Sequence, residues 1–199
     1  MRYKIYLETQ VERKKARFGK GKTFYRYDNR KRLFVMKVVK NYLDKDYFNK
    51  LKSVFVEGID GSKLPFYLQR TVAHKTNKKS LKHFYFTHLF YDHAIMSDFY
   101  ELVKPIIWDT LKAKALIRAK LNLYPRTDTL LHHYPHTDHE FKHKALVLSL
   151  NTCDGGTRVG KEFIPSIENQ AFFFDASIPH NSTTCTNQHA RINLNFNYF

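Results

Sequence analysis

The spacing of apolar residues changes from a helical period to a period of two near residue 115. Between residues 44 and 56, apolar residues recur at helical spacing behind two candidate N-cap aspartates, which predicts an amphipathic helix. A second helical pattern runs from 97 to 111, where Pro105 must kink the helix or begin another one. We expect both helices to be packing elements.

Beyond this point apolar and polar residues alternate, as in strands that have two different faces. The pattern is clearest over residues 117–124. Six further short strands are expected at 129–137, 145–151, 157–164, 171–175, 181–186 and 190–198. Short strands at this spacing predict an all-β barrel or sandwich, so the expected fold class is mainly β with N-terminal α-helices.

The last predicted strand has one apolar face and one face that consists of Arg191 and three asparagines. Asparagine is poorly suited to strands, so this row favours hydrogen bonding inside a polar lumen over an exposed polar face. The planar guanidinium of Arg191 suits bidentate binding of a carboxylate. Asn193, two residues further on, points to the same side.

Composition narrows the function classes. The chain has 199 residues, about one domain, and a formal net charge of +16. Residues 1–40 hold 14 basic and 3 acidic residues, so this segment with its interleaved aromatics is either a non-specific nucleic-acid contact or a solvated basic face. No apolar stretch has the length of a membrane span or follows the basic start as a signal sequence would. We therefore expect a cytoplasmic protein in which Cys153 and Cys185 are reduced thiols.

Five histidines crowd into residues 132–143. His136 and Asp138 are separated by one residue, so in an extended chain both side chains project to one side and can converge on an ion. His180 follows after further predicted strands, and Arg191 comes eleven residues later. Two histidines and one carboxylate form the facial triad that leaves positions on Fe(II) open for a bidentate oxoacid and dioxygen. The sequence therefore predicts an iron site.

A rival metal hypothesis comes from the run between His133 and His139, which approaches the H-x-H-x-D-H motif of dinuclear zinc hydrolases. The first histidine of that motif is displaced by one residue here. A strand would send His133 to the opposite side from His136. We rank the zinc hypothesis below the iron hypothesis.

The combined pattern resembles that of the 2-oxoglutarate and Fe(II)-dependent oxygenases over roughly residues 115–199. Within that superfamily the chain is most similar to prolyl-hydroxylase-like proteins encoded by tailed phages of marine bacteria, which share KALIRAKLNLYPRTD, the H-x-D pair, an H-N-S-T segment and a closing RINLNFNYF. The resemblance implies a double-stranded β-helix (jelly-roll) barrel supported by helices, in a single domain that spans 1–199. Residues 1–114 would supply the basic segment and the supporting helices, and 115–199 the catalytic core.

The resemblance also implies roles for individual residues. His136, Asp138 and His180 would bind Fe(II). Arg191 would form a salt bridge with the distal carboxylate of 2-oxoglutarate, and Asn193 would support that end of the cosubstrate.

A second set of cosubstrate ligands follows from one branch of the superfamily. Asn122 and Tyr124 have the N-x-Y spacing with which the alkylated-base demethylases hold 2-oxoglutarate, and ordinary strand residues are the alternative. The ending R-I-N-L-N-F-N resembles the R-x-N-x-T-F-R of those demethylases, but Asn195 replaces the threonine and Asn197 the final arginine. This departure weakens a role in nucleobase repair.

The implied reaction hydroxylates a C–H bond of a peptidyl substrate, with proline as the expected residue, or of a related small molecule. It would consume O2 and 2-oxoglutarate and release succinate and CO2, with an unknown primary substrate. One alternative is an oxygenase of the same kind that acts on nucleic acid, motivated by the basic segment 1–40. Another is a non-enzymatic, basic nucleic-acid-binding or structural protein on a barrel scaffold, since similar barrels host unrelated functions.

Overall fold

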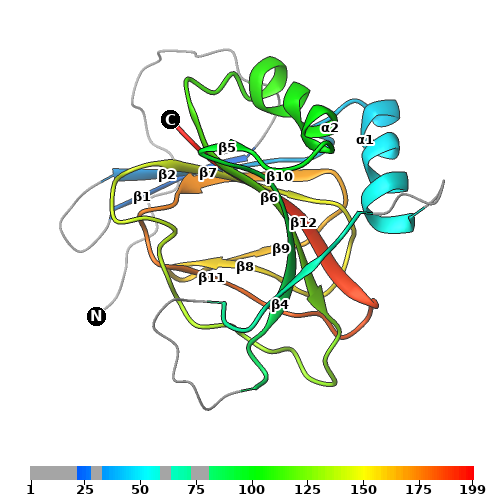
Figure 1. Ribbon diagram of the computed structural model, residues 1–199. Helices are drawn as coiled ribbons and strands as arrows, with labels where there is room; N and C mark the ends of the chain where they lie inside the picture. Colours follow the sequence, from blue (N-terminus) through cyan, green and yellow to red (C-terminus); the bar gives the residue numbers. More distant parts are fainter. Residues whose placement is uncertain (1–21, 28–32, 59–63, 73–80) are drawn as a thin grey trace.

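The computed structural model describes residues 22–27, 33–58, 64–72 and 81–199. The architecture is mostly β with two short helices, and the strands pair into two antiparallel sheets (Figure 1). The pairings of the described residues leave these sheets separate and do not close them into a barrel. The mainly β fold class with helices in the N-terminal half is therefore confirmed.

The larger sheet has nine strands. They are β1 (Lys22–Tyr27), β2 (Leu33–Val39), β3 (Tyr67–Gln69), β4 (Tyr85–Asp92), β5 (Ala94–Ile95), β6 (Leu116–Pro125), β7 (Lys144–Ser149), β10 (Gln170–Asp175) and β12 (Ala190–Tyr198). Their order is β1-β2-β10-β7-β12-β6-β4-β3, with β5 paired to β4. The smaller sheet contains β8 (Gly156–Val159), β9 (Glu162–Pro165) and β11 (His180–Ser182), in the order β11-β8-β9.

The first helix, α1 (Lys45–Lys52), is stabilised at both ends. The Asp44 carboxylate accepts hydrogen bonds from the backbone N–H groups of the first turn, as an N-cap does. The helix continues into a π-helical turn, η1 (Ser53–Glu57), which ends at Gly58. Gly58 has φ of +60°, a conformation that glycine adopts without a Cβ penalty.

The second helix, α2 (Tyr100–Pro105), is shorter than its apolar pattern indicates. It passes at Pro105 into a second π-helical turn, η3 (Ile106–Thr110). Proline lacks an N–H, so the regular hydrogen-bond ladder is interrupted there. The helix type therefore changes at Pro105, the position at which the sequence predicts a kink or a second helix.

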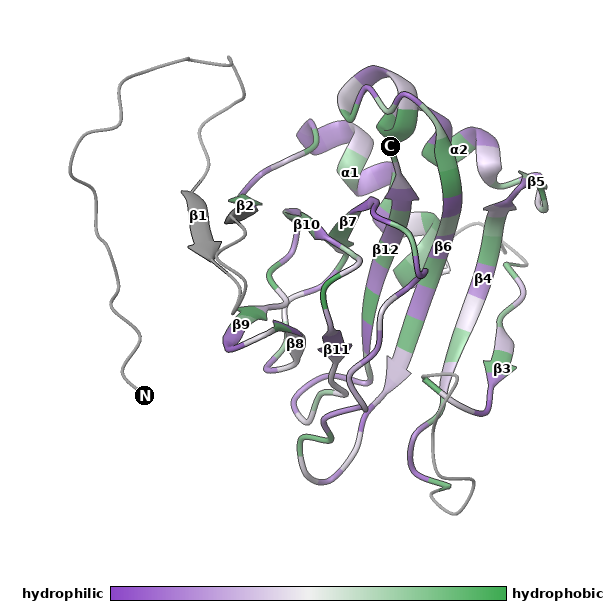
Figure 2. Cartoon of the chain, turned by 90° about the vertical axis from the view of Figure 1, so that its left-hand side faces the viewer, coloured by the Kyte–Doolittle hydropathy of each residue, from purple (hydrophilic) through white to green (hydrophobic). Residues whose placement is uncertain are grey.

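Both helices cover one face of the larger sheet (Figure 1). Apolar side chains of the helices pack there against alternate residues of the central strands, including Leu51, Phe55, Val103, Ile106, Leu121, Leu194 and Phe196. Each fully buried side chain of this kind contributes about 1.5–3 kcal/mol. Because side chains alternate along a strand, the opposite faces of β6 and β12 carry the polar residues, and both strands show alternating hydrophilic and hydrophobic bands (Figure 2).

Three predicted strands differ from the structure. Residues 129–137 form no regular strand and only touch the chain around β11 through isolated bridges; Pro135, which lacks an N–H, prevents a continuous ladder. Residues 157–164 are two strands, β8 and β9, because the chain turns at Gly160, where φ is +57°. The predicted strand 181–186 is reduced to β11.

The N-terminal half contributes more than helices, because β2, β3 and β4 extend the larger sheet at both ends. Most of the basic segment 1–40 lies outside the described residues. Cys153 and Cys185 are both buried and free. None of the described helices has the length and apolarity that a membrane crossing requires.

Candidate metal centre

His136 and Asp138, which are neighbours in the sequence, meet the distant His180 between the two sheets. One ligand atom from each of His136, Asp138 and His180 lies within 4.8 Å of the other two. The backbones of His136 and His180 exchange two hydrogen bonds of 2.9 Å across an isolated bridge, which brings their rings to a centroid distance of 4.7 Å. This bridge holds the irregular segment 129–137 against the start of β11.

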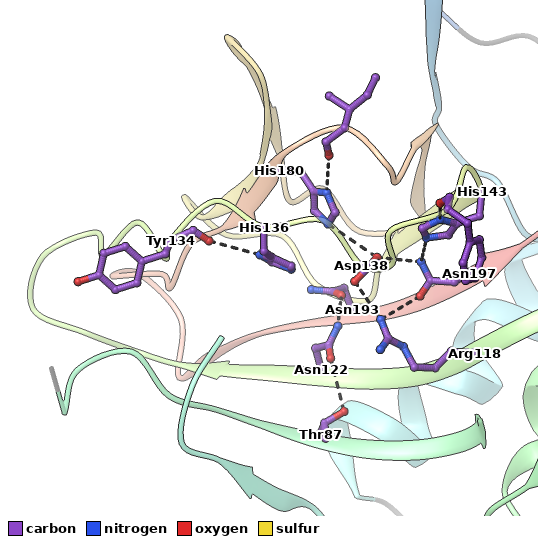
Figure 3. A network of polar contacts seen from close by, with 12 residues as sticks. Thr87, Arg118, Asn122, Tyr134, His136, Asp138, His143, His180, Asn193 and Asn197 are labelled. Carbon is purple, nitrogen blue, oxygen red and sulfur yellow. Dashed lines mark hydrogen bonds and ion pairs between the residues drawn. The ribbon is translucent and has the colours of Figure 1, made fainter. Parts of the chain in front are cut away.

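Both histidine rings are oriented by backbone carbonyl groups. The Nδ1 atom of His180 lies 2.9 Å from the carbonyl oxygen of Ile178, and Nδ1 of His136 lies 3.3 Å from that of Tyr134 (Figure 3). A carbonyl only accepts, so Nδ1 carries the proton in each ring. The Nε2 lone pairs are then available to a metal ion, an arrangement common among metal-binding histidines.

The carboxylate of Asp138 is held by two neighbours from the larger sheet. Arg118 donates to Oδ1 at 2.9 Å, and the Asn197 amide donates to Oδ2 at 2.8 Å (Figure 3). The Asn197 oxygen accepts from Arg118 at 3.1 Å, and its nitrogen lies 3.3 Å from Nε2 of His143. The His143 ring donates in turn from Nδ1 to the carbonyl oxygen of Phe141 at 2.9 Å. This network fixes the orientation of the carboxylate.

The protonation states suit metal binding at neutral pH. Burial and the neighbouring His180 lower the pKa of His136 to about 4, and burial also lowers the pKa of His180. Burial alone would raise the pKa of Asp138, but His180, Lys120 and Arg118 together hold it well below its ordinary value. The three groups are therefore two neutral imidazoles and one carboxylate, the forms that a metal ion requires.

Arg191 on β12 lies deep in the same cavity and is only 1% exposed. Its guanidinium donates to the carbonyl oxygen of Thr183 at 3.1 Å and to the Thr157 hydroxyl at 2.9 Å, and it lies 5.2 Å from the centroid of the Tyr124 ring. Its Nε has no hydrogen-bond partner, and no carboxylate of the described residues forms an ion pair with it. A buried cation without a counter-ion is costly, so this position favours an anionic ligand.

The other predicted cosubstrate residues line the same cavity. Asn122 on β6 donates to the side-chain oxygen of Asn193 on β12 at 3.2 Å, because the two residues face each other in the strand register. Tyr124 stacks on Tyr85 with a centroid distance of 5.3 Å. Nearby, the buried side-chain oxygen of Asn195 also lacks a partner.

The donor set and the unpartnered polar atoms fit Fe(II) and 2-oxoglutarate. Two imidazoles and one carboxylate leave coordination positions open, as in non-heme iron oxygenases. Buried polar atoms without partners are rare in folded proteins, and those of Arg191 and Asn195 belong to residues that line this cavity, where a polar ligand would satisfy them. The structure thus brings all seven predicted site residues to one cavity.

The zinc alternative finds no matching geometry among the described residues. Nδ1 of His133 lies 3.2 Å from Nδ1 of His83, and the metal-binding group contains neither His133 nor His139. Burial, followed by the charge of neighbouring His83, lowers the pKa of His133 to about 3.

Three residues around the site were not assigned a role from the sequence. Arg118 and Lys120 precede Asn122 on the polar face of β6, and Thr157 comes from β8. The period of two that identified Asn122 and Tyr124 also places Arg118 and Lys120 on that face. Nothing in the sequence pointed to Thr157, which reaches Arg191 only because the smaller sheet packs over β12.

Comparison with solved structures finds this fold among oxygenases. An oxidoreductase of the 2OG-Fe(II) oxygenase family from Burkholderia pseudomallei gives a TM-score of 0.52 at 13% identity, over 77% of this chain and 89% of that chain. A Pseudomonas putida prolyl-4-hydroxylase gives 0.54 at 12% identity, over 82% and 91%. HygX from Streptomyces hygroscopicus, solved with nickel and 2-oxoglutarate bound, gives 0.51 at 9% identity, over 82% of each chain.

No family model matches the sequence, and no curated protein matches it. The solved structures, in contrast, show that the chain shares the fold of oxidoreductases that use Fe(II) and 2-oxoglutarate. Within that fold it carries a His-Asp-His group able to hold a metal ion.

Proposed function

We propose that the protein is an Fe(II)- and 2-oxoglutarate-dependent dioxygenase that hydroxylates a C–H bond of a peptidyl substrate. The observation that carries this proposal is the position of a buried, unpaired Arg191 in the same cavity as the triad of His136, Asp138 and His180. A dicarboxylate bound in this cavity would supply the counter-ion that Arg191 lacks, and the triad lines the same cavity. The likeness to a prolyl-4-hydroxylase supports proline as the first residue to test.

Each residue has a role that follows from its position. The two imidazoles and the Asp138 carboxylate would hold Fe(II), which supplies oxidation of the C–H bond by O2 coupled to decarboxylation of 2-oxoglutarate. Arg191 would bind the distal carboxylate, while Thr157 and Tyr124 keep its guanidinium in place. Fixing both ends of the cosubstrate lowers the entropic cost of reaching the reactive geometry.

Arg118 and Asn197 act through Asp138. They hold the carboxylate in one orientation, in which it would bind Fe(II) together with the two imidazoles. His180 is buried and His136 and Asp138 are half-buried between the two sheets, which limits the access of water to the reacting groups.

The test is spectroscopic. Fe(II) followed by 2-oxoglutarate is added to the metal-free protein without oxygen, and the visible charge-transfer band of the chelate is recorded. We expect the band in the native protein, its loss in His136→Ala, and its return in Arg191→Ala only at much higher cosubstrate concentration. A native protein that gives no band would overturn the proposal. Succinate release with prolyl peptides then tests the substrate.

The nucleic-acid alternative rests on the basic segment 1–40, most of which lies outside the described residues. An oxygenase of this kind would bind DNA with an affinity that falls steeply as salt rises, because bound counter-ions are released. Salt-insensitive binding, or none, would remove this alternative.

A further inference from the structure

Two hollows lie next to each other: the cavity that contains the candidate metal centre, and a groove beside it. The groove has a volume of about 680 Å³ and lies over β4, between β3 and the segment that follows β5. A hollow of this size suits a small-molecule or short peptide ligand. Its floor is continuous with the polar face of β6, because Thr87 and Leu89 of β4 pair with Asn122 and Lys120.

Lys120 connects the two hollows. Among the described residues it alone lines both the groove and the metal cavity. The three triad residues line the same metal cavity as Lys120. A substrate that contacts Lys120 from the groove therefore approaches the site of oxidation.

The ammonium group of Lys120 has no acidic partner. It lies 5.7 Å from the centroid of the Tyr85 ring, and no carboxylate of the described residues forms an ion pair with it. Arg118, the other cation of the groove, is already engaged by Asp138 and Asn197. Among the described residues that line the groove, Lys120 is thus the Lys or Arg side chain that remains available to a ligand.

The rest of the groove differs in character. Tyr67 and Met96 present largely exposed apolar surface, at 61% and 57%. Asp92 and Asp98 add negative charge near β5, where a second anionic group would be repelled. The lining therefore suits a molecule with one anionic group and an apolar or aromatic body.

We propose that Lys120 binds a carboxylate of the primary substrate, whose apolar or aromatic body lies along the groove between Tyr67, Tyr85 and Met96. This inference rests on the proposed oxygenase function and narrows the substrate class to a peptide whose reacting residue is C-terminal, and so presents one free carboxylate, as N-benzoyl-L-proline does. The contact places a C–H bond near that carboxylate beside the triad. Arg191 is left to the cosubstrate.

The experiment measures binding of N-benzoyl-L-proline and of its primary amide, which differ in charge but not in ring or shape. Calorimetry without oxygen uses protein loaded with Fe(II) and saturating 2-oxoglutarate. The variants are Lys120→Met, Lys120→Arg and Lys144→Met. Lys144 is a matched control, since its ammonium also lies 5.7 Å from a tyrosine ring, that of Tyr198, and it lines neither hollow.

We expect the acid to bind the native protein at least tenfold more tightly than the amide, and Lys120→Met to abolish this preference. Lys120→Arg should retain it, and Lys144→Met should match the native protein. The affinity for 2-oxoglutarate should change less than threefold in Lys120→Met.

Three results would overturn the inference: equal binding of acid and amide, no binding of the acid by loaded native protein, or a loss of 2-oxoglutarate affinity in Lys120→Met with unchanged probe binding. The last result would assign Lys120 to the cosubstrate. Failure of the native protein to bind Fe(II) and 2-oxoglutarate at all would instead refute the proposed function.

Discussion

The network behind the metal ligands predicts that Asn197 is required for tight metal binding. Asn197 is fully buried and links two charged groups: it donates to Asp138 at 2.8 Å and accepts from Arg118 at 3.1 Å. Asn197→Leu keeps the branching of the side chain at Cγ, removes both hydrogen bonds, and also removes the contact with Nε2 of His143. A hydrogen bond to a charged group contributes about 1.5–3 kcal/mol, and part of the loss is offset by burial of the leucine, so we expect a destabilisation of about 2–4 kcal/mol.

The effect on metal affinity follows from orientation. Without the amide, the Asp138 carboxylate is held by Arg118 alone and is free to rotate away from the metal position. Loss of such a supporting hydrogen bond weakens metal binding about 10–100-fold, which corresponds to roughly 1.4–2.7 kcal/mol.

The matched control is Asn195→Leu. Asn195 lies two residues away on the same face of β12, is 7% exposed, and its side-chain oxygen has no hydrogen-bond partner. We expect its replacement to change stability by less than about 1 kcal/mol, because no charged partner is released. Its metal affinity should stay within about threefold of the native value.

Urea unfolding of the metal-free proteins, followed by circular dichroism, measures the stability difference. Anaerobic competition with a chromophoric chelator measures Fe(II) affinity. Asn197→Leu protein that folds and binds Fe(II) as tightly as the native protein would contradict this prediction. Equal losses of Fe(II) affinity in Asn197→Leu and Asn195→Leu would contradict it as well.

Three further predictions concern pH and packing. Burial holds the pKa of His133 at about 3, below the ~6.5 of an unfolded chain, so the unfolded state takes up a proton first on acidification. The unfolding free energy should therefore fall by roughly 4 kcal/mol between pH 6.5 and 3. Urea titrations of His133→Leu should show no such pH-dependent loss of stability. Because only the neutral imidazole binds metal and the pKa of His136 is about 4, Fe(II) affinity should stay nearly constant from pH 8 to about 6 and decline steeply below about pH 4. A midpoint of the decline in Fe(II) affinity near pH 6.5, measured by chelator competition, would contradict this. A Cβ at Gly155 would lie 2.1 Å from the carbonyl oxygen of Thr184 and 3.0 Å from Cδ of Arg191, so Gly155→Ala should weaken 2-oxoglutarate binding at least tenfold by calorimetry. Gly160→Ala strains the backbone, where φ is +57°, but its Cβ meets no other atom, so this variant should bind 2-oxoglutarate normally.

The alternation of residue types predicted much of the site. Strands β6 and β12 could be read from the sequence because every second residue faces the helices, so their polar faces carry Asn122, Tyr124, Arg191 and Asn193 together. The same alternation contained Arg118 and Lys120, whose roles depend on what faces them. Residues 129–137 form no strand, although the sequence predicts one there. Pro135 lacks an N–H, so the segment pairs with the chain around β11 only through isolated bridges.

The sequence by itself determined the two faces of each strand and the shared side of His136 and Asp138, since these follow from backbone geometry over a few residues. The separation of eleven residues between His180 and Arg191 is likewise a property of the sequence alone. Only the tertiary structure decided that His136 pairs with His180, that Asn197 and Arg118 hold Asp138, and that Lys120 lies between two hollows. The two hydrogen bonds to Asp138 join residues that lie 20 and 59 positions apart in the sequence. Such contacts are set by how sheets pair and pack, which the local pattern of residues leaves open.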